Sequence, residues 1–285
     1  MLRTILLLLC VPSLLSAAEV KRLAEGMRFT EGPVADGKGN IYYSDIPNNR
    51  IMKWDGKQNS VWRENSGGAN GLKIDRDGNL VACEGVARRI TRISIADQKV
   101  TVLADQFEGK KLNSPNDLAI DTKGGIYFTD PRYGNRDDME LDKEAVYYLP
   151  PKGGKLLRVA DDLVRPNGIH IDRDKIYIAD AGGRKTYAYR MNPHGTLSDK
   201  KEFVALGSDG MKVDAKGNVY LTTGGKIEII APDGKSIGSI QMPEVEVGGK
   251  MVREGPANLV FSGTTLYITA RTGFYSVEMD VKGQP

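Results

Sequence analysis

The chain has 285 residues, with 40 Lys and Arg against 37 Asp and Glu, which gives a formal net charge of +3. Because this balance is close and the charges are scattered, we predict neither a nucleic-acid partner nor binding to a membrane surface. The 33 glycines, with no low-complexity linker between them, are typical of one domain that is rich in tight turns.

The first 18 residues are predicted to be a secretory signal peptide. Arg3 precedes an apolar run over residues 5–11, and Ser16-Ala17-Ala18 supplies the small residues of a cleavage site. The run is short for a membrane span, which makes an uncleaved anchor the weaker alternative. We therefore expect a periplasmic or secreted protein. Cys10 would leave with the signal peptide, and Cys83, at an apolar strand position, is expected to be buried.

The rest of the chain repeats a turn-and-strand pattern six times. The copies begin at residues 36, 75, 121, 172, 214 and 262, and Asp36-Gly37-Lys38-Gly39-Asn40 followed by an apolar strand is a full example. Gly-rich turns of this kind connect the strands of a hairpin. A spacing of 39 to 51 residues is typical of β-propellers with four strands per blade. The sequence therefore predicts an all-β fold, a single six-bladed β-propeller formed by residues 19–285.

Within each unit we expect a second strand, a third strand and a more polar outer strand. Third strands are predicted over residues 50–54, 89–93, 145–149, 185–190, 226–230 and 273–277. The segment 19–26 precedes the first unit and has no inner strands of its own. We expect it to be the outer strand of the last blade, where it closes the ring. No long helix is expected.

A polar residue stands five positions before each repeated Asp. These residues are Glu31, Asn70, Asn116, Asn167 and Asp209, and the sixth unit has Ala257 with Asn258 beside it. The first strands of a propeller line its channel in one direction, so residues at one fixed position form a ring at one mouth. Two carboxylates and three amide oxygens, with no His or Cys, suit Ca²⁺, Mg²⁺ or Mn²⁺ better than a soft-ligand zinc site.

A turn is the simpler explanation for any one of these residues taken alone, because Asn-Gly and Asp-Gly are common turn pairs. Five such residues in one register favour a site instead. Glu31 carries the most weight, since Glu is a poor turn former. Two carboxylates at one narrow mouth are also costly without a compensating cation.

Five stretches occur in a characteristic order over essentially the whole mature chain. They are Glu31-Gly32-Pro33, Ser114-Pro115-Asn116-Asp117-Leu118, Phe128-Thr129-Asp130-Pro131-Arg132-Tyr133-Gly134, Arg165-Pro166-Asn167-Gly168-Ile169 and Ser208-Asp209-Gly210. In this order the chain resembles the gluconolactonase, regucalcin and luciferin-regenerating-enzyme family of six-bladed propellers. The second and third stretches look like its bacterial sugar-lactonase branch.

The resemblance implies a divalent metal ion, Ca²⁺ first, with Mg²⁺, Mn²⁺ or Zn²⁺ as alternatives. Glu31, Asn167 and Asp209 would hold it, with Asn116 as a fourth ligand or a substrate contact. The resemblance also implies hydrolysis of a small-molecule sugar lactone such as glucono-1,5-lactone. Animal relatives carry a substrate-contacting Arg at the position of Ser114, so their substrate preference does not carry over.

Asn70, Asn116, Asp130 and Tyr133 are the expected substrate contacts. For Asp130 and Tyr133 a Pro-stiffened structural turn is an equally good interpretation. The metal would polarise the lactone carbonyl and stabilise the developing oxyanion, while a carboxylate activates the attacking water. Asp209 is assigned as this catalytic base, and Glu31 is the other candidate.

Two other functions stay open at this point. One is a metal-dependent aryl ester or phosphotriester hydrolase that uses the same site, and the other is a non-catalytic propeller that binds a carbohydrate or a protein. The sequence does not set the oligomeric state. His170, just past Asn167 on an inner strand, is expected to be a hydrogen-bonded channel histidine, with support of the ligands as the alternative.

Overall fold

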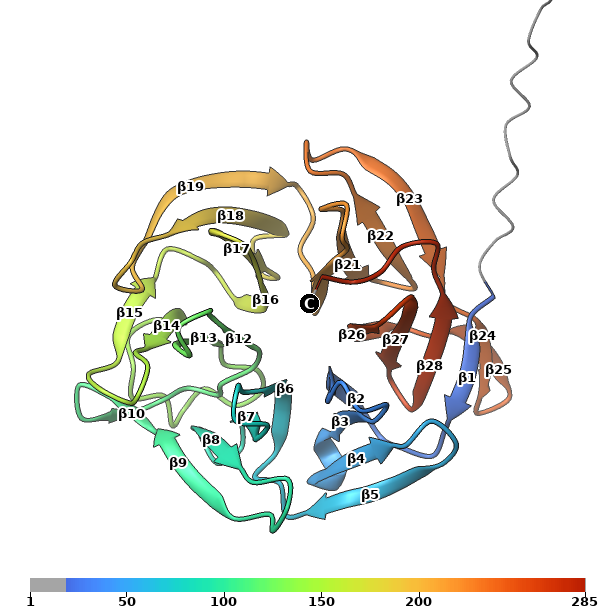
Figure 1. The fold of residues 1–285 in the computed structure, drawn as a ribbon, viewed down its shortest axis with the longest axis horizontal. Coiled ribbons are helices and arrows are strands. Elements are labelled where there is room, and N and C mark those ends of the chain that lie inside the picture. The colour runs from blue at the N-terminus through green and yellow to red at the C-terminus, as the bar shows by residue number, and fades with distance from the viewer. Residues whose placement is uncertain (1–18, 285) are drawn as a thin grey trace, which may run out of the picture.

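The computed structural model describes residues 19–284, so the expected signal peptide lies outside the described residues. Six four-stranded antiparallel sheets are arranged around a central channel (Figure 1). The prediction of a six-bladed β-propeller is confirmed. Within residues 19–284 the one helical element is the 3₁₀ turn η1 (Ile46–Asn48), in agreement with the expected lack of long helices. No helix in this part of the chain has the length and apolar character needed to span a bilayer.

Each blade is one sheet whose strands follow one another outwards from the channel. Blade 1 contains β2 (Thr30–Ala35), β3 (Ile41–Asp45), β4 (Arg50–Trp54) and β5 (Asn59–Glu64); blade 2 contains β6 (Ala69–Ile74), β7 (Leu80–Glu84), β8 (Arg89–Ile93) and β9 (Val100–Ala104). Blade 3 contains β12 (Leu118–Ile120), β13 (Ile126–Asp130), β14 (Ala145–Leu149) and β15 (Leu157–Ala160); blade 4 contains β16 (Pro166–Asp172), β17 (Lys175–Asp180), β18 (Lys185–Met191) and β19 (Leu197–Val204). Blade 5 contains β20 (Met211–Val213), β21 (Val219–Thr223), β22 (Lys226–Ile230) and β23 (Ser236–Gln241); blade 6 contains β26 (Pro256–Ser262), β27 (Thr265–Ala270), β28 (Gly273–Glu278) and β1 (Lys21–Ala24).

The last blade takes its outer strand from the start of the chain. β1 pairs antiparallel with β28, with Lys21 opposite Ser276 and Arg22 opposite Tyr275, and the two strands lie side by side in Figure 1. The predicted closure by residues 19–26 is therefore confirmed. Pairing the two ends of the chain satisfies a sheet edge that would otherwise be exposed.

In four of the six blades the repeated Asp forms the hairpin turn at the end of the inner strand. Asp36 accepts hydrogen bonds at Oδ1 from the backbone nitrogens of Lys38 at 2.7 Å and Asn40 at 3.0 Å. The same pair of backbone bonds recurs at Asp75, Asp121 and Asp214. An Asp side chain that bonds its own backbone two residues on favours a tight turn, which explains why the repeat is visible in the sequence.

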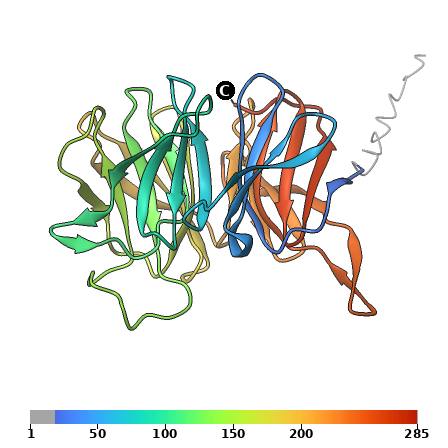
Figure 2. The ribbon, with the colours of Figure 1, turned by 90° about the horizontal axis from the view of Figure 1, so that it is seen from below.

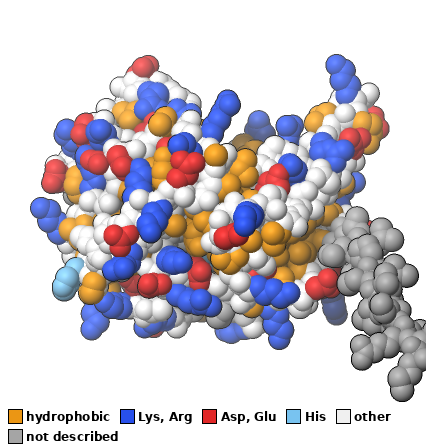
Figure 3. Space-filling view, turned by 90° about the horizontal axis from the view of Figure 1, so that it is seen from above, with side chains coloured by type: hydrophobic (Ala, Val, Ile, Leu, Met, Phe, Trp, Pro, Cys, Tyr) orange, Lys and Arg blue, Asp and Glu red, His pale blue; other side chains and the backbone are white. Residues whose placement is uncertain are grey.

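The core consists of apolar layers between neighbouring blades. The second strands β3, β7 and β13 are buried along their whole length, and Tyr43 of blade 1 stacks on Phe274 of blade 6 with ring centroids 4.4 Å apart. Cys83 is fully buried in the layer between blades 2 and 3, as predicted. On the side seen in Figure 3, Lys and Arg are interspersed with Asp and Glu.

Two hairpins outside the blades were not predicted. They are β10 (Gln106–Phe107) with β11 (Lys110–Lys111), and β24 (Glu244–Val247) with β25 (Lys250–Arg253). β24 and β25 project from the face of the propeller opposite the C-terminal residues, and so does the loop after β13 (Figure 2).

Candidate functional site at one mouth of the channel

The polar residues that precede the inner strands meet in one cavity. This cavity has a volume of about 480 Å³, and Phe29, Ile46 and Val86 contribute apolar surface to it. Its polar lining comprises Glu31, Asn70, Ser114, Asn116, Tyr133, Asn167 and Asp209. The ring that the repeat predicts therefore exists, and all of the expected site residues except Asp130 line the cavity.

Close approach of successive inner strands brings these side chains together. A Cβ atom at Gly32 would lie 1.9 Å from the carbonyl oxygen of Asn70, and one at Gly168 would lie 2.7 Å from that of Asp209. Only glycine fits at such distances. The glycine that follows a site residue thus has a packing role as well as a turn role.

Hydroxyl groups of the second strands fix the site residues of the next blade. Ser44 donates to the carbonyl oxygen of Asn70 at 2.5 Å, and Thr129 donates to that of Asn167 at 2.8 Å. Sequence reasoning missed these two residues. The signal was available, because both are small hydroxyl residues just before the acid that ends their strand.

Those strand-ending acids position the segments that lead into the site. Asp130 is fully buried, and its carboxylate accepts from the backbone nitrogens of Asn113 at 2.8 Å and Ser114 at 2.7 Å. Asp45 and Asp180 each accept from two backbone nitrogens ahead of Glu31 and Asn167 in the same way. Burial raises the pKa of Asp130 to about 7. The expected contact between Asp130 and substrate is therefore corrected: its oxygens are committed to the backbone, and it does not line the cavity.

A hydrogen-bonded chain links Tyr133, Asn167 and Asp209. The amide nitrogen of Asn167 donates to the Tyr133 hydroxyl at 2.8 Å and to Asp209 Oδ1 at 2.7 Å. Burial and the charge of Asp209 raise the pKa of Tyr133 to about 12, so its hydroxyl stays protonated at neutral pH. The chain fixes the direction in which the Asn167 amide points.

The two carboxyl groups of the ring share a buried environment. Glu31 is only 3% exposed and accepts from the backbone nitrogen of Gly32 at 2.7 Å. Burial, followed by the charge of Asp209, raises the pKa of Glu31 well above its usual value. Burial also raises the pKa of Asp209 to about 6, with a further contribution from Asp117. Both groups would ionise more readily beside a cation.

Asp117 is a third buried carboxylate that the sequence reasoning did not single out. It is 1% exposed, accepts from the backbone nitrogen of Leu118 at 2.8 Å, and faces the amide of Asn258 at 3.3 Å. The sequence carried a signal, because Asn116 is followed by this acid where Glu31, Asn70, Asn167 and Asp209 are followed by glycine.

The residues of the ring fit a hard divalent cation. Among residues 19–284, no three His, Cys, Asp or Glu side chains gather closely enough to hold an ion by themselves, so a metal here needs amide ligands. Within the same described range, the amide oxygens of Asn70 and Asn167 are buried and have no hydrogen-bond partner. A buried amide oxygen that lacks a donor, as at Asn167, forms with two carboxylates a donor set that suits Ca²⁺, and the Asn70 oxygen is in the same way free to accept from a substrate hydroxyl.

His170 lies on an inner strand and lines the channel, as expected. Its Nε2 atom is buried and has no hydrogen-bond partner among the described residues, so its expected hydrogen bond stays a prediction. Burial, followed by the charges of Lys212 and Lys73, lowers the pKa of His170 well below its usual value. The acidic ring therefore adjoins a part of the channel that is positively charged, where Lys73 and Lys212 lie near His170.

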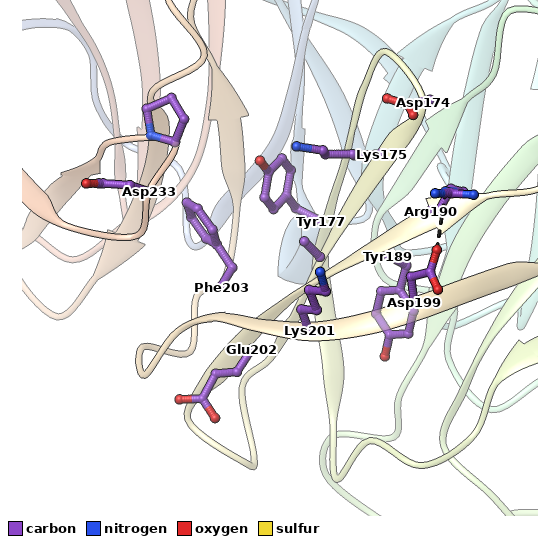
Figure 4. Close-up of a pocket in the computed structure, with 12 residues that line it drawn as sticks. Asp174, Lys175, Tyr177, Tyr189, Arg190, Asp199, Lys201, Glu202, Phe203 and Asp233 are labelled. Carbon is purple, nitrogen blue, oxygen red and sulfur yellow. Dashed lines mark ion pairs between the residues drawn. The ribbon is translucent and has the colours of Figure 1, made fainter.

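Two of the other cavities lie beside the ring and at the edge of the propeller. One, of about 550 Å³, adjoins the ring at Asp209 and also contains Arg184 and Arg271. The other, of about 380 Å³, lies beside the outer strands of blade 4, where Arg190 pairs with Asp199 at 3.3 Å (Figure 4). None of the predicted site residues lines the cavity beside blade 4.

Fold and site together define a six-bladed propeller with an acid-and-amide site at one mouth of its channel. A family model described as the SMP-30/Gluconolactonase/LRE-like region matches residues 29–272. The chain belongs to this family.

Known proteins agree with this assignment. A gluconolactonase of Zymomonas mobilis is 30% identical over 256 residues, which is 78% of this chain and 72% of the relative. The solved structure of a gluconolactonase from Xanthomonas campestris has a TM-score of 0.82 at 30% identity, and the match covers 93% of this chain and 90% of that one. Diisopropyl-fluorophosphatase of Loligo vulgaris is 22% identical over 276 residues, which is 86% of this chain and 85% of the relative.

Proposed function

We propose that this protein is a metal-dependent lactonase that hydrolyses a sugar lactone. The observation that carries the proposal is the convergence of Glu31, Asn167 and Asp209 on one cavity of about 480 Å³. This volume lies within the range of small-molecule sites. The gluconolactonases among the relatives support the same reaction.

Glu31, Asn167 and Asp209 would hold the metal, with Asn116 as a further ligand or as a substrate contact. A bound divalent ion supplies positive charge that polarises an ester carbonyl and stabilises the negative charge developing on its oxygen. Asn70 and Tyr133 line the same cavity and present an amide and a hydroxyl to the substrate. They would orient the sugar hydroxyls.

Asp209 is the proposed base. With a pKa near 6 it is largely ionised at neutral pH and can accept a proton from the attacking water at a carboxylate oxygen. The amide nitrogen of Asn167 donates to Oδ1 of Asp209 and holds the carboxylate in place. Tyr133 holds Asn167 in place through its hydroxyl.

The test is hydrolysis of glucono-1,5-lactone by the mature protein, measured as proton release above the spontaneous rate. The assay runs after chelation and again with Ca²⁺, Mg²⁺, Mn²⁺ or Zn²⁺ restored singly. We expect turnover to return with metal, and Asp209→Asn to lower kcat by about 100-fold or more with the fold intact, because general bases contribute on this scale. Asp233→Asn, which removes an exposed acid, is the matched control. The proposal would be contradicted if the Asp209→Asn variant hydrolysed the lactone at the full rate in the presence of chelator.

A phosphotriester or aryl ester is the alternative substrate class. The similarity to diisopropyl-fluorophosphatase favours keeping it, since the same acid-and-amide site would face a phosphoryl oxygen in place of a carbonyl oxygen. Metal binding together with phosphotriester turnover and no lactone turnover would select this alternative.

We also propose that the protein is exported, because the sequence of residues 1–18 has the pattern of a signal peptide. Expression of the whole chain should give a mature protein that begins at Glu19, in the periplasm or the medium. Mass spectrometry of the fractionated protein checks this, and an intact Met1 terminus in the cytoplasmic fraction would contradict it.

A further inference from the structure

The channel continues below the site into a second cavity, of about 650 Å³. Its walls come from the inner strands of all six blades. On each inner strand, the residue that lines this cavity follows the residue of the site ring by three positions in the sequence. Val34, Lys73, Ala119, His170, Lys212 and Val260 form this second ring. The same repeat that builds the site therefore builds another ring at the opposite end of the inner strands.

The second ring has the opposite charge to the first. Lys73, His170, Arg173 and Lys212 line the lower cavity, and no Asp or Glu is among the described residues that line it. Arg173 is paired with Asp172 at 3.9 Å, so Lys73 and Lys212 are the cations that matter here. The site cavity of about 480 Å³, which is the upper cavity, contains Glu31 and Asp209, and no Lys or Arg is among the described residues that line it. The channel is thus acidic at one mouth and basic at the other.

Lys212 is the central group of the lower cavity. It is only 7% exposed, and its Nζ donates to the carbonyl oxygen of Met211 at 2.9 Å. Burial and the charge of Lys73 lower the pKa of Lys212 to about 7. Asp117 and Glu31 act in the opposite direction from the site side, but neither lines the lower cavity. A buried cation with so little counter-charge is costly unless an anion joins it.

The cavity also presents neutral donors. Thr122 contributes a hydroxyl group and Gln284 an amide. The C-terminal segment brings Gln284 to this mouth. The backbone nitrogen of Gln284 donates to the carbonyl oxygen of Val213 at 3.1 Å, and its side-chain amide donates to the carboxylate of Asp172 at 2.9 Å. Figure 1 shows this segment crossing from β28 to the centre of the propeller.

We propose that the lower half of the channel is a binding site for a small oxyanion, a phosphate or a carboxylate. Lys73 and Lys212 supply its charge, and His170 supplies a ring nitrogen that has no hydrogen-bond partner among the described residues. Lysine ammonium groups are donors that bind phosphate and carboxylate as point charges. The site is distinct from the metal site, because the two cavities share no lining residue.

Calorimetric titration of inorganic phosphate into the chelator-treated mature protein tests the proposal. We expect saturable binding that Lys73→Met and Lys212→Met each weaken by about tenfold or more, since removing one charged contact costs about 1.4 kcal/mol or more. Lys99→Met removes an exposed lysine outside the channel and should bind as the unchanged protein does. Ser114→Ala, which changes a neutral residue of the site cavity, should also keep phosphate binding, which separates the two cavities.

A second arm identifies the source of the oxyanion. Gluconate and glucose are titrated in parallel, because they share hydroxyl groups and only gluconate carries a carboxylate. Binding of gluconate but not glucose assigns a sugar-acid site, and binding of phosphate alone assigns a phosphate site. His170→Asn provides a third variant should Lys212→Met fail to fold. The proposal is overturned when neither phosphate nor gluconate binds, or when Lys73→Met and His170→Asn bind both as the unchanged protein does.

Discussion

Three carboxyl groups, those of Glu31, Asp117 and Asp209, lie buried at one end of the channel and set its electrostatics. Burial raises the pKa of Glu31 and of Asp209, and the charge of Asp117 contributes to both shifts. A carboxyl whose folded-state pKa is raised stabilises the fold while it is protonated and loses that contribution as pH rises through the folded value. The metal-free site therefore opposes folding at neutral pH.

The pH dependence of stability should reveal this cost. For Asp209 the window runs from its unfolded pKa, near 3.8, through about 6. Without metal, Asp209→Asn should raise Tm by about 5 °C at pH 8 and by about half as much at pH 5, because pH 5 lies about midway between the unfolded and folded pKa values of Asp209. Thermal melts in chelator at both pH values give the comparison. Asp117→Asn should act in the same direction, and an Asp209→Asn variant that melts below the unchanged protein at pH 8 would contradict the account.

At the scale of single residues, the sequence predicted the five residues of the ring and wrongly placed Asp130 in the cavity. Glu31, Asn70, Asn116, Asn167 and Asp209 followed from register alone, because inner strands of a propeller are equivalent. Asp130 was misassigned because its nearness to Tyr133 in sequence says nothing about the direction of its side chain. Asp117 was missed because it takes the place of a glycine, and its partner Asn258 is 141 residues away.

At the scale of strands, a hydroxyl group ties each of three second strands to the next blade. Thr129 on β13 donates to the carbonyl oxygen of Asn167 on β16, and Thr222 on β21 donates to that of Ala257 on β26. Ser44 on β3 does the same for Asn70 on β6. The predicted strand positions were confirmed, since alternation and turns are local signals. These bonds between blades were not visible, because they join residues 26 to 38 positions apart.

Thr129→Val tests whether this contact positions the site. Valine keeps the shape of the side chain but leaves the carbonyl oxygen of Asn167 and the backbone nitrogen of Asp117 without their hydroxyl partner. We expect a loss of about 2–4 kcal/mol in unfolding free energy, with weaker metal binding because Asn167 moves. Calorimetric melting and metal titration measure the two effects. Thr129→Ser keeps the hydroxyl group and should retain most of the metal affinity; an equal loss in both variants would show that packing, not the hydrogen bond, is responsible.

At the scale of the whole molecule, one four-residue strand joins the two ends of the chain. β1 covers the outer edge of β28, and Leu23 packs against the cluster that contains Met27, Tyr43 and Phe274. The channel and both of its rings depend on the blades keeping their spacing. Loss of this closure should therefore affect residues far from β1.

Removal of residues 19–26 should lower Tm by about 10 °C, because it exposes the edge of β28 and uncovers part of an apolar cluster. A chain that begins at Lys21 keeps β1 and is the matched control. Both chains are compared by thermal melting and by the metal affinity of the ring. Since blade 1 follows blade 6 directly around the ring, we expect Glu31 on β2 to shift and metal affinity to fall along with Tm. An unchanged Tm in the shorter chain would mean that contacts between blades hold the ring closed without β1.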